Sequence, residues 1–211
     1  MDGTADIIRF KDERVYMQRY SIVLVTGIVM LYAVPVFIIG QEPWSLYSMM
    51  RGAGICGLIS LSLGVLLNLN KRAVKSVFKR PFLRVHHTFV IIGLFLISLH
   101  PLLYAYLTGY LGVFIPDITS LYTFFATGGR SALLLIYLAF FAGLVRMMIR
   151  KQWRYIHALA YPGLLLATVH ATLIGQTLKH PLVSVIVYGL FFMVCISGVA
   201  VRMNGRRQTM S

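Results

Sequence analysis

Charged residues are scarce in this sequence, and acidic residues are the scarcest of them. Only 12% of the 211 residues are charged, which is about half the usual share in a soluble domain, and Asp and Glu together number six. Hydrophobic residues make up 58%, and the mean hydropathy is +0.78. This composition excludes a soluble enzyme, and it also excludes intrinsic disorder, which requires low hydrophobicity.

Cysteine is nearly absent as well. The two cysteines, Cys56 and Cys195, both lie within apolar runs of the sequence. Neither a disulfide framework nor a thiolate metal site is therefore indicated.

Long uncharged runs dominate the chain. A helix needs about 20 mostly apolar residues to cross the hydrocarbon core of a membrane. Six runs meet this requirement: 20–40, 52–70, 87–108, 131–149, 156–175 and 182–201. We therefore predict an all-α integral membrane protein whose six-helix domain covers 20–201, between an N-terminal segment 1–19 and a C-terminal tail 202–211. The segment 1–19 is polar and acidic, so the first run is not expected to be a cleavable signal peptide.

Positive charge is concentrated on one side of the predicted bundle. The net charge is +14, and of the 20 basic residues only Arg51, Arg130 and Lys179 fall on the side opposite the two termini. The positive-inside rule makes the basic side cytoplasmic, with both termini inside, in a plasma (inner) membrane. Because the basic residues flank membrane spans in short segments, we expect them to contact anionic lipids or an acidic cytoplasmic partner, and not nucleic acid.

Apart from Arg146 at the inner end of the fourth span, histidine is the ionisable residue that enters the predicted spans. Five of the six histidines lie in or at the ends of the third and fifth spans, and His180 lies in a loop. Ionisable side chains within membrane helices usually mark a functional site. The third span carries His86 and His100, and the fifth carries His157 and His170. Each pair is separated by about 20 Å along its helix, and both helices cross in the same direction.

This spacing predicts that His86 and His157 face each other at one depth, and that His100 and His170 do so at another. Two imidazoles at each depth are typical of a haem iron held from both sides. Zinc sites usually have ligands three or four residues apart, often with cysteine or carboxylate, and no acidic residue lies in any predicted span. A proton channel or transporter based on histidine is the alternative without a cofactor, and the absence of intramembrane acids speaks against it.

The angular positions of the histidines agree only in part with this prediction. At about 100° per residue, His86 and His100 lie on nearly the same face of a helix, whereas His157 and His170 differ by about 140°. A kink at Pro162-Gly163 or an irregular first turn at His157 would bring both rings to one face. The sequence leaves both explanations open.

Two stretches of the chain resemble the ferric-reductase-like transmembrane domain, the haem-carrying six-helix module of ferric reductases and NADPH oxidases. These stretches are LRVHHTFVIIGLFLISLHPLLY (83–104) and WRYIHALAYPGLLLATVHATLIG (153–175). The family has a spaced histidine pair in each of helices three and five. It also has a Trp shortly before a Leu/Ile-His in helix five, which Trp153 and Ile156-His157 match.

The resemblance implies two b-type haems between the third and fifth helices. It makes His86 and His157 iron ligands of an inner haem, with His87 competing with His86, and makes His100 and His170 ligands of an outer haem. Arg84 or Arg154 would serve the propionates of the inner haem, and Arg130 those of the outer one. Glycines of the second span would make room for a porphyrin, or would serve only close helix packing; they are Gly52, Gly54, Gly57 and Gly64.

The implied activity is that of a cytochrome b subunit of an oxidoreductase, which passes single electrons across the membrane. The expected donor is a separate cytoplasmic flavoprotein or another cytoplasmic donor, and the acceptor on the outer side is ferric iron, oxygen, a quinone or a periplasmic protein. The chain has no G-x-G-x-x-G motif, so FAD or FMN is expected only through a partner or at the inner face. The chain is also similar to the haem-binding membrane subunit of the bacterial periplasmic methionine-sulfoxide reductase system. A haem sensor or scaffold without turnover is a further alternative.

Overall fold

The computed structural model describes residues 24–67 and 71–209, and within this part of the chain the regular structure is helical throughout. A first helix covers Leu24–Gly40. It is followed by α2 (Leu46–Leu66), α3 (Lys71–Phe78), α4 (Phe82–Thr108), η2 (Leu111–Phe114), α5 (Leu121–Ala126), α6 (Gly129–Leu144), α7 (Trp153–His157), α8 (Ala160–Ile174), η3 (Gln176–Lys179) and α9 (Pro181–Thr209).

Within residues 24–67 and 71–209, four helical segments are long and apolar enough to cross a membrane. They are Leu46–Leu66, Phe82–Thr108, Trp153–Ile174, which joins α7 to α8, and Pro181–Val199. The remaining two predicted spans correspond to shorter apolar helices, Leu24–Gly40 and Gly129–Leu144. The start of the predicted span 20–40 and the segment 1–19 lie outside the described residues. Helix α9 continues to Thr209, into the predicted tail 202–211.

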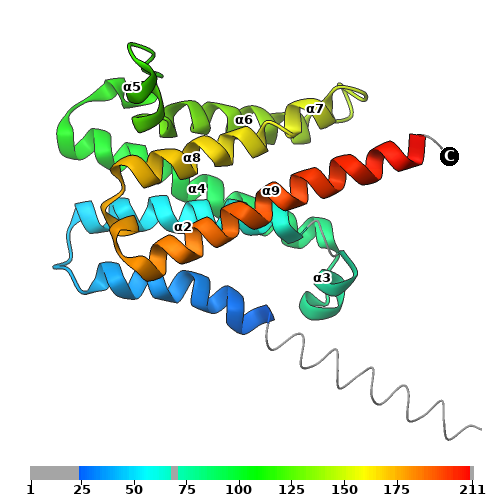
Figure 1. Cartoon of the computed structure of the whole chain (residues 1–211), viewed down its shortest axis with the longest axis horizontal. Helices are drawn as coiled ribbons and strands as arrows, with labels where there is room; N and C mark the ends of the chain where they lie inside the picture. Colours follow the sequence, from blue (N-terminus) through cyan, green and yellow to red (C-terminus); the bar gives the residue numbers. More distant parts are fainter. Residues whose placement is uncertain (1–23, 68–70, 210–211) are drawn as a thin grey trace, which may run out of the picture.

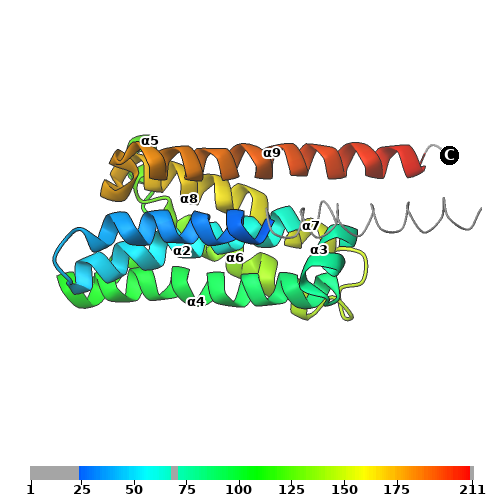
Figure 2. The same ribbon diagram turned by 90° about the horizontal axis from the view of Figure 1, so that it is seen from below.

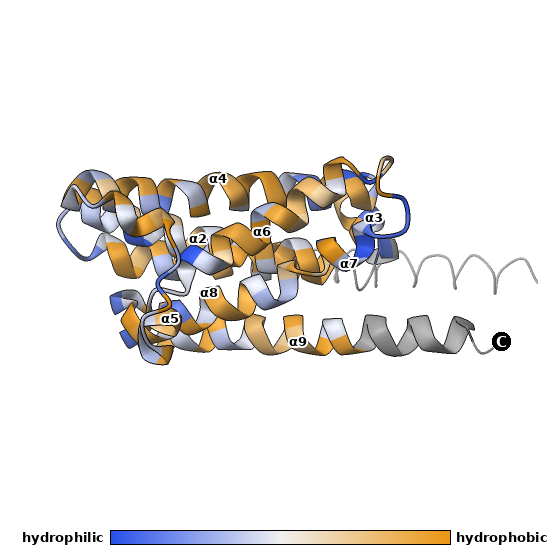
Figure 3. Cartoon of the chain, turned by 90° about the horizontal axis from the view of Figure 1, so that it is seen from above, coloured by the Kyte–Doolittle hydropathy of each residue, from blue (hydrophilic) through white to orange (hydrophobic). Residues whose placement is uncertain are grey.

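The long helices lie side by side, with α3 and α7 at one end of the bundle and α5 at the other (Figures 1 and 2). We call these the α3 end and the α5 end. Helix α2 packs along α4, and α6 packs along α8, so that the bundle contains two helix pairs. The long helices are mostly apolar, and hydrophilic residues gather near the ends of the bundle (Figure 3), as expected for a chain that crosses a hydrocarbon layer.

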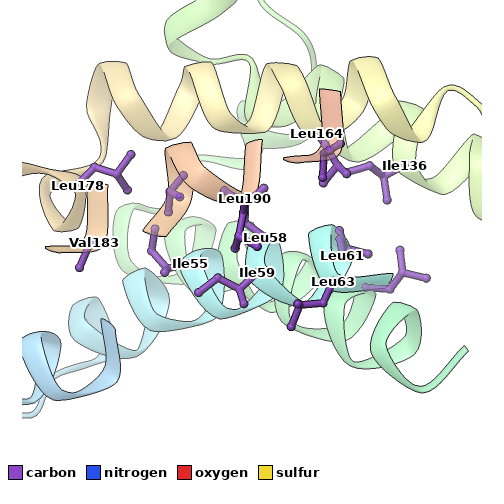
Figure 4. Packing of buried hydrophobic residues seen from close by; sticks show 13 residues of the cluster. Ile55, Leu58, Ile59, Leu61, Leu63, Ile136, Leu164, Leu178, Val183 and Leu190 are labelled. Atoms are coloured by element: carbon purple, nitrogen blue, oxygen red, sulfur yellow. The ribbon is translucent and has the colours of Figure 1, made fainter. Parts of the chain in front are cut away.

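Helix α2 is the central element of the fold. Of the apolar stretch with which α2 would cross the membrane, 61% is buried inside the bundle. The corresponding share in the other three candidate spans is 17–28%. The core places Ile55, Leu58, Ile59 and Leu61 of α2 against residues of α6, α8 and α9, among them Leu164 (Figure 4). The outer helices expose large apolar side chains instead, which is the surface that a lipid-facing helix presents.

Two glycines allow α2 and α4 to approach closely. A Cβ added to Gly57 would lie 2.6 Å from Cγ2 of Ile97, and one added to Gly93 would lie 2.7 Å from Cγ of Leu61. Small residues at such contacts are what brings helices together in membranes, where burial of apolar area gives little driving force. For Gly57, close packing is therefore the role that the structure supports.

Helix α3 is a short amphipathic helix held against the base of α4. Val74 is 3% exposed, and it forms a small cluster with Leu67 and Val85, against which Phe78 packs. Lys71 and Lys75 of α3, and Lys79 directly after it, remain exposed. This arrangement keeps a row of positive charges at the α3 end.

Replacing Gly57 by alanine is expected to lower the stability of the bundle. The new methyl group would also lie 2.9 Å from the backbone nitrogen of Ile97, which cannot rotate away as a side chain can. Overpacking of this kind costs about 1–3 kcal/mol. Thermal unfolding in detergent measures the effect, with Gly189→Ala as the control, because a Cβ at Gly189 on α9 meets nothing within 4 Å. Equal melting temperatures for the two variants would contradict close packing of α2 on α4.

Candidate functional site

The four histidines of the predicted pairs meet in the interior of the bundle. His86 on α4 lies beside His157 on α7, with ring centroids 6.4 Å apart and ring planes at 64°. His100 on α4 lies beside His170 on α8, with centroids also 6.4 Å apart and planes at 77°. The structure thus brings these residues together in two pairs, one toward the α3 end and the other toward the α5 end.

Each of these imidazoles donates its Nδ1–H to a backbone carbonyl of a neighbouring helix. A carbonyl oxygen can only accept, so the proton must reside on Nδ1 and the lone pair on Nε2. The four bonds join His86 to Gly64, His100 to Met50, His157 to Ala139 and His170 to Ala126, with N···O distances of 2.8, 2.9, 2.8 and 2.7 Å. This is the usual way in which a ligating histidine is oriented for a metal.

The carbonyl acceptors repeat the spacing of the histidines. The histidines of α4 bond to α2, its antiparallel neighbour, and those of the α7–α8 segment bond to the α5–α6 segment. Because antiparallel helices rise at the same rate, two histidines 14 residues apart meet two carbonyls 14 residues apart, Met50 and Gly64. Each helix pair therefore carries one half of both histidine pairs.

A break in the helix positions His157. Helix α7 ends at His157 and α8 begins at Ala160, and at the junction Leu159 and Tyr161 donate to carbonyls three residues back instead of four. Pro162 has no N–H, and its ring displaces the carbonyl four residues before it, that of Ala158. The sequence left open a kink at Pro162-Gly163 or an irregular turn at His157. In the structure the two occur together, as parts of one break in the helix.

Glycines lie against each of the four rings. A Cβ on Gly54 would be 3.0 Å from Nδ1 of His100, and a Cβ on Gly129 would be 3.0 Å from Nε2 of His170. Gly64 and Gly143 face the other two rings. A Cβ on Gly64 would be 3.9 Å from Nδ1 of His86, and a Cβ on Gly143 would be 3.5 Å from Nδ1 of His157. A helical side chain covers the turn before its own Cα, so Gly54 and Gly143 leave open the carbonyls four residues earlier that accept the imidazole N–H groups.

The spacing of the rings suits two ligands of one metal ion. A metal–imidazole bond is about 2 Å long, and the ring centre lies about 1 Å beyond the ligating nitrogen, so opposite ligands have centroids roughly 6 Å apart. Both pairs match this distance. Among the described residues no three His, Cys, Asp or Glu side chains come together. Each pair could therefore supply two ligands to one ion, and a macrocycle such as haem would have to bring the remaining ones itself.

A cavity of about 350 Å³ adjoins the pair at the α5 end. His100 and His170 line it together with apolar side chains of α2, α4, α6 and α8, and two arginines, Arg51 and Arg130, lie at its wall. An apolar slot with cationic groups suits a flat apolar ligand that carries carboxylates. The residues of this end therefore fit haem.

Arg51 is a site residue that the sequence analysis assigned only to the charge balance. Its side chain is 10% exposed, its Nε donates to Thr177 Oγ1 at 2.9 Å, and its Nη1 lies 2.7 Å from Oε1 of Glu42. A charged residue buried this far in a membrane bundle marks function by default. In the sequence, Arg51 stood out only as one of three basic residues on the side opposite the termini.

Arg130 also lines the cavity, and its Nη1 donates to the carbonyl of Ile115 at 3.0 Å. The other two predicted arginines lie at the α3 end. Arg84 is exposed, and Arg154 is exposed with its guanidinium over the ring of Trp153 at 5.8 Å.

Aromatic rings extend from the histidine pair at the α3 end toward this surface. Trp153 lies 5.9 Å from His157, and Phe82 lies 5.7 Å from His86, between ring centroids. Lys71 Nζ in turn lies 5.5 Å from the Phe82 ring. Each histidine of this pair is therefore connected through an aromatic ring to a surface cation.

The two remaining histidines differ from the paired ones. His87 is exposed, and its ring contacts the ring of His86 at 5.8 Å. His180 is exposed at the end of η3. The carbonyl bond to Gly64 thus distinguishes His86 from its neighbour in the sequence.

The comparison with protein families gives one match. The model described as "Ferric reductase like transmembrane component" matches residues 53–168, more than half of the chain. The chain therefore belongs to the ferric-reductase-like transmembrane family. The matched stretch contains His86, His100 and His157 and ends two residues before His170. Searches of curated proteins and of solved structures give no match. The chain is a multi-pass membrane protein, and its family indicates a membrane electron-transfer module.

Replacing Arg51 by alanine is expected to destabilise the protein by about 1–3 kcal/mol, because Thr177 and Glu42 lose a charged donor. The exposed Lys179→Ala on the same side is the control, for which a change within about 0.5 kcal/mol is expected. Arg51→Lys should fall between them, since it keeps the charge and loses the fork of donors. Unfolding in detergent measures all three, and an Arg51→Ala variant as stable as Lys179→Ala would show that the network contributes nothing.

Proposed function

We propose that the protein is a b-type cytochrome subunit that passes single electrons across the plasma (inner) membrane through two haems, each held by two histidines. The observation that carries this proposal is the pair of imidazole pairs at 6.4 Å, with all four Nδ1–H groups fixed to backbone carbonyls. His86 and His157 would hold one haem, and His100 and His170 the other.

Bound haem would supply the one-electron redox chemistry of iron. Two histidines of each pair would hold one haem through Nε2, and ligation by two histidines would favour electron transfer over binding of oxygen. The bonds to backbone carbonyls would keep each imidazole in its neutral form, with the proton on Nδ1 and Nε2 available as the ligand atom. Arg51 and Arg130 would place positive charge near the propionates at the α5 end, and the apolar walls would exclude water.

The α3 end suits the entry of electrons from a separate donor. Its exposed cations, including Lys71 and Arg154, would attract an acidic donor surface or anionic lipids. Phe82 and Trp153 lie between these cations and the histidines. The positive-inside rule places this end in the cytoplasm, so electrons would leave at the α5 end. The donor would be a flavoprotein or another cytoplasmic reductant, and the acceptor ferric iron, oxygen, a quinone or a periplasmic protein.

Alanine substitution of the histidines tests the proposed ligands. The purified protein should show two low-spin b haems in a reduced-minus-oxidised spectrum, and His86→Ala or His100→Ala should lower the haem-to-protein ratio from two to one. His87→Ala is the matched control, because His87 lies next to His86 in the sequence and is exposed. A colourless wild-type protein would overturn the proposal. Retention of both haems in His100→Ala would overturn the ligand assignment.

Gly54→Ala should weaken haem binding at the α5 end, because its methyl group would press on Nδ1 and Cε1 of His100. Gly52→Ala is the control on the same helix, since a Cβ there meets only Cδ1 of Ile39, at 3.9 Å. The measurement is the rate at which haem is transferred from the protein to apomyoglobin, followed by absorbance. We expect loss of one of the two haems to be several-fold faster in Gly54→Ala than in Gly52→Ala. Equal rates would mean that the glycine is not needed for the ring.

A further inference from the structure

The segment 109–122, which we call the outer strap, joins the end of α4 to the start of α5. It contains η2 and a single charged residue, Asp117. Several of its large apolar side chains are strongly exposed, notably Leu111 (74%), Ile118 (80%) and Leu121 (75%). Apolar residues this exposed on a connecting segment require a partner surface.

The strap leaves the bundle sideways and not along its axis. Gly109 ends α4 with a φ of 68°, a left-handed conformation that glycine adopts without strain. After it the chain extends laterally at the α5 end, level with the ends of the long helices (Figure 1). A segment in this position lies beside the helix ends, where a bilayer has its lipid–water interface.

The strap follows an exposed apolar stretch at the end of α4. Tyr106 is 77% exposed on the last turn of α4, and Tyr110 and Tyr122 are exposed within the strap. Tyrosine is enriched at the membrane interface, where its ring is apolar and its hydroxyl reaches water. Exposed apolar residues therefore follow one another along the chain from Tyr106 and Leu107 of α4 to Tyr110 and Leu111 of the strap.

The only charge of the strap is on a polar turn. The hydroxyl and the backbone N–H of Thr119 both donate to Asp117, at 2.7 and 3.0 Å, and these bonds lower the pKa of its carboxyl group. Asp117 is therefore ionised at neutral pH and belongs on the aqueous side. Ile118, between these two residues, provides the apolar side.

Arg130 fixes the strap over the cavity at the α5 end. Its Nη1 donates to the carbonyl of Ile115, its guanidinium lies 5.7 Å from the centre of the Tyr110 ring, and Val113 of η2 lines the cavity. The strap thus has an inner side on the cavity and an outer side of exposed apolar residues.

We propose that the outer strap lies in the lipid–water interface, with Leu111, Ile118 and Leu121 in the acyl region, and so closes the lipid side of this cavity. The occupant of its apolar side is the bilayer, because that side follows the exposed apolar end of α4 and carries no charge. The proposal does not depend on haem.

Nitroxide labels on single cysteines test the depth of the strap. Cys56 and Cys195 are replaced by alanine, and cysteine is introduced at Ile118, Leu121 or Thr119 in the full chain in nanodiscs of phosphatidylethanolamine and phosphatidylglycerol. Phe192→Cys on the exposed face of α9 is the lipid reference, and Lys151→Cys in the loop before α7 is the aqueous reference. The readout is the ratio of collisions with oxygen to collisions with a water-soluble nickel chelate.

We expect this ratio at Ile118 and Leu121 to be several-fold above that at Thr119 and to lie between those at Lys151 and Phe192, because Phe192 is near the middle of its span. Nickel accessibility at Ile118 and Leu121 equal to that at Lys151 would overturn the proposal and leave the strap exposed in water. Protection of both labels from oxygen and nickel alike would overturn it in favour of contact with a protein. Because the labels report depth and not redox activity, each outcome stands apart from the haem spectra.

Discussion

A polar group inside a membrane bundle must find its partner within the protein, and this constraint shapes the site more than any other. An imidazole brings one N–H and one lone pair into the apolar interior. In all four paired histidines the N–H is bound by a helix carbonyl, and that carbonyl can accept it because it has a second lone pair. One nitrogen is then satisfied, and the other keeps its lone pair for a ligand.

This constraint explains why the helices are paired as they are. An acceptor for each of two histidines on one helix exists only if a neighbouring antiparallel helix presents carbonyls at the same spacing. Helix α2 does this for α4, and the α5–α6 segment does it for α7–α8. Glycine at positions such as Gly54 and Gly143 keeps those carbonyls uncovered. The burial of α2 in the centre of the bundle fixes one of these acceptor helices in place.

The two helix pairs meet across the space that holds the rings, where Ser98 of α4 and Tyr137 of α6 share a hydrogen bond of 2.6 Å. Arg51 of α2 also bonds to Thr177 of η3, the turn that follows α8. The two ends differ in chemistry. The α5 end has buried arginine beside a cavity, whereas the α3 end has aromatic rings and exposed cations. A direction of electron flow, as proposed, would use this difference.

The sequence by itself determined the membrane character, because scarce charges and long apolar runs act locally along the chain. It also identified the family and the helices that carry histidine, since spacing along a helix converts directly into depth. It did not determine which backbone carbonyls bind the rings, how the turn before Pro162 presents His157, or that Arg51 would line the same cavity as His100. These features depend on contacts between residues far apart in the chain, such as Arg51 and Thr177. Only the packing of α2, α4, α6 and α8 decides such contacts, because the partner of a side chain lies on a neighbouring helix and not next to it in the sequence.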